Sequence, residues 1–597
     1  MSKNKKIIPI DYTHREYRSI KQDLLGIVER YYPDQFQDFS EASFGSMMLD
    51  AVAYVGDQMS FYLDYNVNES FLDTSYSLQN IQRHGRILGY KEKGPASTFG
   101  TIAMFLEVPA EASGLGPDVK YIPTLNRGTR FKSQSGLSYL LTENINFSDP
   151  KHPIVVSKVG ATTGAPTHYA IKAYGSIVSG VFGVEEITVG QYQKFRTLIL
   201  QTTNVAEILS VIDSDGNKYY EVDNLSQDMV FQEIPNNNFK NDNVPSILKP
   251  LLVSRKFVVL RRGSSVSIQF GSGQESSTSL IADPQRVAMD VFGKDYVTST
   301  TFDPTRISKN VNYGIVPSNT KLRILYRKTN PTNSNAAVGT INKVGNSSFD
   351  FGNLNGAANS KLVAVRESLE VTNESPIIGQ NTYTSPQEIK QQIFDTFPTQ
   401  NRAVTQADYE NVLYRMPSKY GSIKRCSAQK DSDSLKRNLN MYVLSEDSFG
   451  KLVKTNLTIK QNIKTWLNHY RMMNDTIDLL DAHIINLGIE FIITVLPQAE
   501  KGTALAKANG QLSRYFSEGF YIGEHFQISD IYSELKKIPE VLDVTHVKII
   551  NKSGAQYSNI QFSVDKNLSP SGASLICPQN AIFEIKFPAV DIKGKFR

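Results

Sequence analysis

Apolar residues near the start of the chain recur at the three- and four-residue spacing of amphipathic helices. The pattern predicts three helices, over residues 14–31, 43–65 and 77–88. Ser40 and Ser43 are both suitable N-cap residues for the second of these helices, because a serine hydroxyl accepts a hydrogen bond from the first turn. We therefore expect an N-terminal helical bundle region over residues 1–95.

The second predicted helix is apolar over most of its circumference. One apolar face carries Phe44, Met48, Val52, Val55, Met59 and Tyr62, and another carries Met47, Ala51, Tyr54, Phe61 and Tyr65. Such a helix must be covered on more than one side. One neighbouring helix of the same chain can cover one face, so the first face is expected to form an interface with a partner in a shared helical bundle. The alternative is a central helix of a self-contained bundle, and the pattern leaves both open.

Three carboxylates follow one stripe of the same helix. Asp50, Asp57 and Asp64 are seven residues apart, which is nearly two turns. The rise between successive members is about 10.5 Å, so they cannot share one cation. We expect a solvated stripe or one paired with arginine.

The middle of the chain has the pattern of antiparallel strands. Short β-branched and aromatic segments are separated by Gly, Pro, Asn and Ser, as at residues 101–108, 194–201, 257–261 and 265–270. This predicts a β-rich region over residues 96–384, with an inserted loop or hairpin where Asn, Ser and Gly are frequent, at residues 330–359.

Helical spacing returns at Ser385 and then alternates with strand patterns. Thr405 and Asp408 have the spacing of a capping box and open a helix to about Tyr414. Further strands are expected at residues 438–444, 484–496 and 541–550, and further helices at 456–470, 502–517 and 528–537. Small α+β modules are therefore expected at residues 385–482 and 483–597. The predicted fold class is a multidomain α+β protein.

Composition narrows the functional classes. The 597 residues include 64 basic and 59 acidic ones, a balance that does not indicate a nucleic-acid-binding protein. Hydrophobic residues make up 40% and charged residues 21%, as in a globular protein. No apolar segment approaches the roughly 20 residues that span a bilayer, so no membrane partner is expected. The two cysteines exclude a disulfide scaffold and a cysteine-ligated zinc site.

Motifs for catalysis are missing from the sequence. The eight histidines show no His-Glu-x-x-His spacing, and neither a Gly-x-Ser-x-Gly turn nor a phosphate-binding loop is found. Gly271-Ser272-Gly273 follows a predicted strand but lacks the third glycine of a dinucleotide fingerprint, so a tight hairpin turn is expected there. We expect no catalytic residues, no metal and no cofactor.

Five segments in order resemble the baseplate J-like family, and in particular the baseplate wedge subunit of contractile-tailed bacteriophages. They are Asp38–Thr74 with its Glu69-Ser70-Phe71, Ile122–Phe131, Ile268–Gly273, Gln400–Glu410, and Tyr521–Val544. The fourth is the most specific, because Arg402, Thr405, Asp408 and Tyr409 match the family's Arg-Ala-Val-Thr-x-x-Asp-Tyr element. Thr405 and Asp408 suit the start of a helix, and Arg402 is a candidate to bind a carboxylate near the preceding loop.

The resemblance implies a structural, non-enzymatic virion protein that is assembled in the host cytoplasm. Its expected partners are other baseplate wedge proteins, a second copy of itself and neighbouring wedges. Together they would form the inner baseplate ring around the tail hub and transmit the trigger for sheath contraction.

Two alternatives stay open. The large β region and the 29 Tyr and 30 Phe residues also suit a tail-associated carbohydrate-binding or glycan-cleaving protein. The equivalent subunit of a type VI secretion system or phage-tail-like device is the other.

Overall fold

The structure is a computed structural model. It describes residues 16–32, 43–112, 115–161, 164–227, 229–235, 246–274, 313–330, 333–352, 358–380, 385–431, 438–554 and 556–596. The chain divides into two compact units. One holds residues 1–91 and 384–398, and the other holds residues 92–383 and 399–597. The predicted α+β multidomain class is confirmed. The four domain boundaries expected from the sequence stay a prediction.

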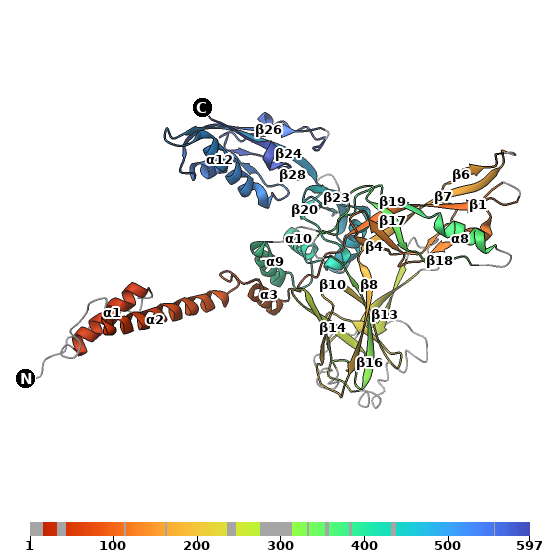
Figure 1. Ribbon diagram of the computed structural model, residues 1–597, viewed down its shortest axis with the longest axis horizontal. Coiled ribbons are helices and arrows are strands. Elements are labelled where there is room, and N and C mark those ends of the chain that lie inside the picture. Colours follow the sequence, from red (N-terminus) through yellow and green to blue (C-terminus); the bar gives the residue numbers. More distant parts are fainter. Residues whose placement is uncertain are drawn as a thin grey trace, which may run out of the picture. The chain divides into compact units, whose positions relative to one another are not determined.

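The first unit is helical. Its elements are α1 (Tyr17–Tyr31), α2 (Phe44–Glu69), α3 (Leu78–Ile87) and most of α9 (Pro386–Thr399). Ser43 is the N-cap of α2, and its hydroxyl accepts a hydrogen bond from the Ser46 N–H at 3.1 Å. The predicted start at Ser43 is therefore confirmed, whereas Ser40 lies outside the described residues. Figure 1 shows α1 alongside the longer α2.

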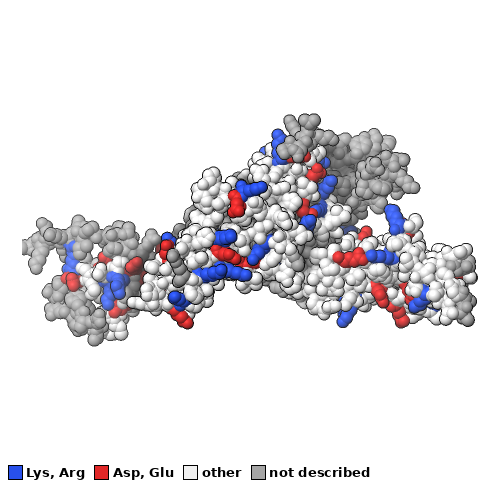
Figure 2. All heavy atoms as spheres, turned by 90° about the horizontal axis from the view of Figure 1, so that it is seen from above, with Lys and Arg blue, Asp and Glu red and all other residues white. Residues whose placement is uncertain are grey.

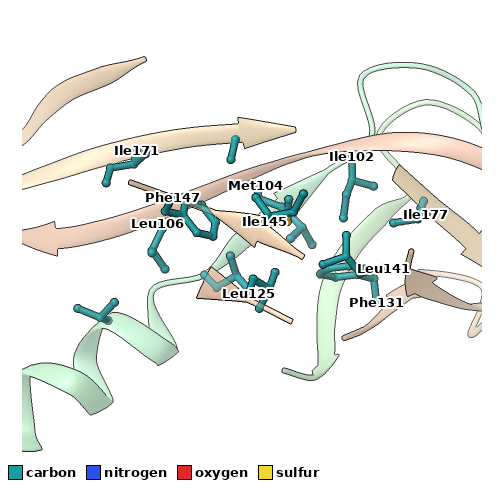
Figure 3. Packing of buried hydrophobic residues seen from close by; sticks show 14 of the residues in the cluster. Ile102, Met104, Leu106, Leu125, Phe131, Leu141, Ile145, Phe147, Ile171 and Ile177 are labelled. Carbon is teal, nitrogen blue, oxygen red and sulfur yellow. The ribbon is translucent and has the colours of Figure 1, made fainter. Parts of the chain in front are cut away.

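A mostly antiparallel β body begins the second unit. One sheet has the strand order β17-β3-β4-β7-β1-β19, with β6 also paired to β7. Its strands are β1 (Phe99–Pro109), β3 (Arg130–Ser133), β4 (Ser138–Leu141), β6 (Ile154–Val159), β7 (Pro166–Ser179), β17 (Ile341–Asn346) and β19 (Glu370–Thr372). The short strands β2 (Thr124–Leu125), β5 (Ile145–Asn146) and β18 (Phe349–Asp350) form a small sheet. Side chains from both sheets and from α8 (Asn359–Glu367) share one core, and Figure 3 shows Leu106, Phe147 and Leu125 within it.

A second β body lies in sequence between β7 and β17. Its order is β8-β16-β10-β11-β14-β15-β9. The strands are β8 (Val181–Val189), β9 (Thr197–Ile199), β10 (Val205–Asp213), β11 (Lys218–Glu221), β14 (Lys256–Arg262), β15 (Ser265–Phe270) and β16 (Thr320–Lys328). The hairpin of β12 (Met229–Pro235) and β13 (Ser246–Leu252) is separate. The core of this body includes Phe257 and Phe270, which are almost fully buried.

Two α+β parts complete the unit. In the first, α10 (Gln406–Tyr414) and α11 (Leu457–Asn468) share a core with β20 (Arg425–Lys430), β21 (Asn438–Glu446), β22 (Leu452–Lys454) and β23 (Thr476–Asp481). The second has β24 (His483–Val495), β26 (Val541–Lys552), β28 (Ala581–Glu584) and β29 (Ile592–Phe596), with α12 (Lys501–Tyr515), α13 (Ile528–Lys536) and α14 (Pro588–Asp591). A small sheet of β25 (Phe526–Gln527) and β27 (Ser574–Leu575) lies beside it.

Two local predictions can be compared with the strands. Of the loop or hairpin expected at residues 330–359, one long loop is excluded, because β17 lies among them and pairs with β3, and β18 pairs with β2. Gly271 and Gly273 do not form a tight hairpin either. Gly273 forms a parallel bridge to Ile315, and a Cβ on Gly271 would lie only 2.3 Å from the carbonyl oxygen of Tyr313. Glycine is needed there because the two backbone segments approach closely.

Candidate interaction surface

Helix α2 is 26 residues long and is covered along a narrow strip. Ser46, Ala53 and Glu69 are its buried residues. Helix α1 packs against this small-residue side, since a Cβ placed on Gly56 would lie 3.4 Å from Cδ1 of Ile20. Small side chains allow two helices to approach closely, which explains why α1 packs on this side of α2.

The Asp50 carboxylate joins the two helices. It accepts a hydrogen bond from the Tyr17 hydroxyl at 2.7 Å and lies 2.6 Å from the Lys21 ammonium. The Lys21 ammonium, followed by the Tyr17 hydroxyl, lowers the pKa of the Asp50 carboxyl. We expected Asp50 to face solvent or to pair with an arginine. That prediction is wrong, because its partners are Lys21 and Tyr17.

All six residues of the predicted interface point into solvent. Their exposed fractions run from 50% at Met48 to 73% at Phe44, and the others are Val52, Val55, Met59 and Tyr62. The second face is exposed as well, with Met47, Tyr54, Phe61 and Tyr65 each at least 41% exposed. We expected one helix of the same chain to cover one apolar face. That expectation is wrong, because α1 covers neither and occupies the strip around Asp50 and Ala53 instead.

A compact joint connects the end of α2 to α3. The Glu69 carboxylate accepts hydrogen bonds from the Tyr76 N–H at 2.8 Å, the Ser77 N–H at 3.1 Å and the Asn80 side-chain amide at 2.7 Å. These donors lie at the start of α3, where a helix favours negative charge. The Asn80 hydrogen bond is the main reason that the pKa of Glu69 is lowered. Glu69 thus fixes the chain direction between the two helices.

Helix α9 completes this joint although it lies some three hundred positions further along the chain. Ile81 of α3 and Ile393 of α9 are fully buried together with Tyr90. A Cβ on Gly85 would lie 2.9 Å from Cδ1 of Ile393, so the glycine allows close packing. This pairing could not be predicted from the sequence, because nothing in the local pattern of α9 indicates which distant helix it contacts.

The Arg-Ala-Val-Thr-x-x-Asp-Tyr element lies at the start of α10. The Asp408 N–H donates to the Thr405 hydroxyl at 3.2 Å, and the Asp408 carboxylate accepts from the Thr405 N–H at 2.9 Å. The predicted capping box is confirmed. Arg402 lies 3.5 Å from the side-chain oxygen of Gln400, so its described contact is an amide and not the expected carboxylate.

Tyr409 ties α10 to the turn before β23. Its ring is buried, and its hydroxyl donates to the Asp475 carboxylate at 2.6 Å. Desolvation, together with this hydrogen bond, raises the pKa of Tyr409 to about 12. Thr405, Asp408 and Tyr409 therefore act within the fold.

Two features of the described residues bear on whether they could bind a metal ion or a small molecule. No group of three or more His, Cys, Asp or Glu side chains among them is placed to hold a metal ion. A pocket of about 420 Å³ lies where β22, β24 and β28 meet, and it contains the Glu584 carboxyl. That carboxyl accepts hydrogen bonds from the Leu452 N–H and the Asn486 amide, and burial raises its pKa. Glu584 connects strands of two sheets, which is a structural role.

Charge and helix length add two observations. On the face shown in Figure 2, basic and acidic side chains are interspersed, and neither sign forms a large continuous area. Within the described residues, no helix has both the length and the apolar character to cross a membrane.

Comparisons with known proteins bear on the helical unit. No curated protein sequence matches the chain. A solved structure of the anti-feeding prophage (AFP) baseplate is similar at 9% identity, covering 94% of this chain and 89% of that chain with a TM-score of 0.25. A structure of the type VI secretion system TssK-TssF-TssG baseplate subcomplex is similar at 6% identity, covering 73% and 96% with a TM-score of 0.23. TM-scores this low do not show a shared fold.

The sequence match to a family is local. Residues 14–87 match the family described as bacteriophage baseplate protein, N-terminal domain. The matched residues include α1, α2 and α3, so they contain both apolar faces of α2 and the Glu69 joint. Over these residues the chain is similar to that family, and the match covers no other part of the chain.

Proposed function

We propose that the chain is a non-enzymatic structural subunit of the baseplate of a contractile phage tail or a phage-tail-like device. The family match over residues 14–87 supports this assignment. Within it, the chain serves as a wedge subunit of the inner ring around the tail hub, and its C-terminal α+β parts contact neighbouring wedges. It also helps to transmit the trigger for sheath contraction. These finer roles rest on the resemblance described above.

The observation that carries the proposal is the solvent exposure of α2. Phe44, Met59 and Tyr62 expose 60–73% of their side chains on a helix that its own chain contacts through small and polar residues. Monomers rarely expose continuous apolar patches above roughly a few hundred Å². Burial of such side chains contributes about 1.5–3 kcal/mol each, so the free helix has a strong tendency to associate.

The protein that binds the exposed faces of α2 is another subunit of the assembly. A second copy of this chain is one candidate. Amphipathic helices bury their apolar sides by packing into bundles, with residues at i, i+4 and i+7 or i+8 facing the neighbour. Phe44, Met48, Val52, Val55, Met59 and Tyr62 follow that spacing. Both apolar faces are free, so α2 has room for more than one neighbouring helix.

The test replaces apolar side chains on the exposed face of α2 and leaves the side that contacts α1 unchanged. In the variant Met48→Asp, Val52→Asp, Met59→Asp, the full chain is expected to fold with unchanged helix content and to lose association with itself and with candidate baseplate proteins. Analytical ultracentrifugation of the chain alone measures its association with itself, and the same measurement with each candidate protein measures association with that protein. The matched control Met48→Leu, Val52→Ile, Met59→Leu keeps the face apolar and should assemble. Assembly of the aspartate variant would show that α2 is not the interface.

A further inference from the structure

The sheet of β24, β26 and β29 is covered by helices on one face. Ile489, Phe491 and Ile493 of β24 are at most 1% exposed and share a core with Leu512 of α12 and Leu535 of α13. Figure 1 shows α12 lying along the sheet. Because neighbouring residues in a strand point to opposite sides, Glu490 and Ile492 point to the other face.

The strand register identifies the neighbours of these two residues. Glu490 is paired with Lys548 of β26 on one side and with Lys593 of β29 on the other. Ile492 is paired in the same way with His546 and Lys595. Directly paired residues lie on the same face of a sheet. The four outer residues are all exposed, whereas Glu490 and Ile492 are half-buried between them.

A further lysine extends this arrangement along β26. A Cβ on Gly488 would lie 2.7 Å from Cε of Lys552 and 3.1 Å from Cγ1 of Ile550, so both side chains cover the glycine on this face. We call the set His546, Lys548, Lys552, Lys593, Lys595, Glu490, Ile492 and Ile550 the basic sheet face. It holds four lysines and one carboxylate.

Several lysines elsewhere in the same part of the chain have acidic partners, whereas those of the basic sheet face have none within ion-pair distance in the part of the chain that the structure describes. Lys507, Lys536 and Lys537 each form an ion pair, with Glu540, Asp543 and Glu534 respectively. Among the described residues, no ion pair involves Lys548, Lys552, Lys593 or Lys595. Four lysines around a single carboxylate leave an excess of positive charge, which favours an oppositely charged partner.

We propose that the basic sheet face docks an acidic surface of a partner protein. Alternate residues of a strand are about 6.6–6.8 Å apart, so carboxylates at every second position of an extended segment match Lys593 and Lys595. The inference deepens the proposed function and rests on it, because it gives the C-terminal part of a baseplate subunit the chemistry of its neighbour.

The centre of the face favours protein over nucleic acid. Glu490 lies between Lys548 and Lys593, so the face is not uniformly basic, unlike a surface that follows a phosphate backbone. Ile492 and Ile550 supply apolar contact, and the face has no Phe, Tyr or Trp on which a base could stack. A mixture of charged and apolar side chains is typical of protein–protein interfaces.

The test measures binding of the full chain to a fluorescein-labelled peptide with alternating Glu and Thr. The variant Lys548→Glu, Lys593→Glu, Lys595→Glu is expected to weaken binding by about tenfold or more, since three attractive pairs become repulsive. The control Lys151→Glu, Lys464→Glu, Lys566→Glu makes the same change of net charge at exposed lysines elsewhere and should stay within about twofold. Glu490→Gln should strengthen binding, because it removes a repulsive charge.

The proposal would be overturned if the unaltered chain did not bind the peptide, or if the control variant weakened binding equally. It would also be overturned if a single-stranded DNA of equal charge bound more tightly than the peptide and the changes at Lys548, Lys593 and Lys595 abolished that DNA binding. Failure here is distinguishable from failure of the proposed function. The aspartate variant on α2 tests assembly through a different surface and should bind the peptide normally.

Discussion

The carboxylate of Glu69, the last residue of α2, accepts a hydrogen bond from the side-chain amide of Asn80 on α3 at 2.7 Å. The same carboxylate holds the Tyr76 and Ser77 N–H groups. One acidic side chain therefore joins the helix that carries the exposed apolar faces to the small cluster of α3 and α9.

Replacing Glu69 with glutamine should loosen this joint. Glutamine has one acceptor oxygen instead of two and no charge, so the N–H groups of Tyr76 and Ser77 should exchange with solvent deuterium faster. Hydrogen exchange followed by mass spectrometry measures this, with Glu29→Gln on α1 as the control.

The joint should also depend on pH. The folded pKa of Glu69 is below its unfolded value, so its stabilisation is present above the unfolded pKa of about 4.3. It is lost as the pH falls through the folded pKa. The difference in exchange between the unaltered chain and Glu69→Gln should therefore disappear in that acid range. A difference that persists there would contradict the role given to the carboxylate.

The capping box of α10 predicts a local loss of stability. Thr405→Ala removes the acceptor of the Asp408 N–H and should lower the free energy of opening α10 by about 0.5–2 kcal/mol. Native-state hydrogen exchange of the α10 amides measures this local free energy, whereas a global transition would average over several domains. Thr405→Ser keeps the hydroxyl and should behave like the unaltered chain. Equal exchange in the alanine variant would show that the cap does not stabilise α10.

Tyr409 predicts a stability change at alkaline pH. Tyr409→Phe removes the hydrogen bond to Asp475 and should cost about 1 kcal/mol at neutral pH. The folded pKa of Tyr409 is about 12 against a model-peptide value of about 10. A raised pKa means that the stabilisation is complete below pH 10 and is lost as the pH rises towards 12.

The phenylalanine variant therefore should differ from the unaltered chain at pH 8 and converge with it above about pH 12. Hydrogen exchange of the amides around Met472 and Asp475, corrected for the intrinsic rate at each pH, reports the difference. Tyr220→Phe, on a half-buried tyrosine of β11, is the control. A constant difference at every pH would show that ionisation of Tyr409 plays no part.

Much of the local structure could be predicted from the sequence. Helix starts at Ser43, Thr405 and Asn456 agree with the structure, because a cap depends on a side chain and an N–H only three residues away. The strands β21, β24 and β26 were also predicted, since alternation of polar and apolar residues reflects burial of one face. The spacing also identified the two apolar faces of α2, but not that both are exposed.

The tertiary structure decided which surfaces meet. The sequence shows that α2 has two apolar faces, but α1 lies on the strip with Asp50 and Ala53, where small residues allow close approach and Lys21 finds a carboxylate. Similarly, Ile393 contacts Gly85 although about half of the chain separates them in sequence, and β29 places Lys593 beside Glu490. Local rules act over a few residues, whereas these contacts depend on the fit of surfaces from distant segments, which only the folded chain brings together.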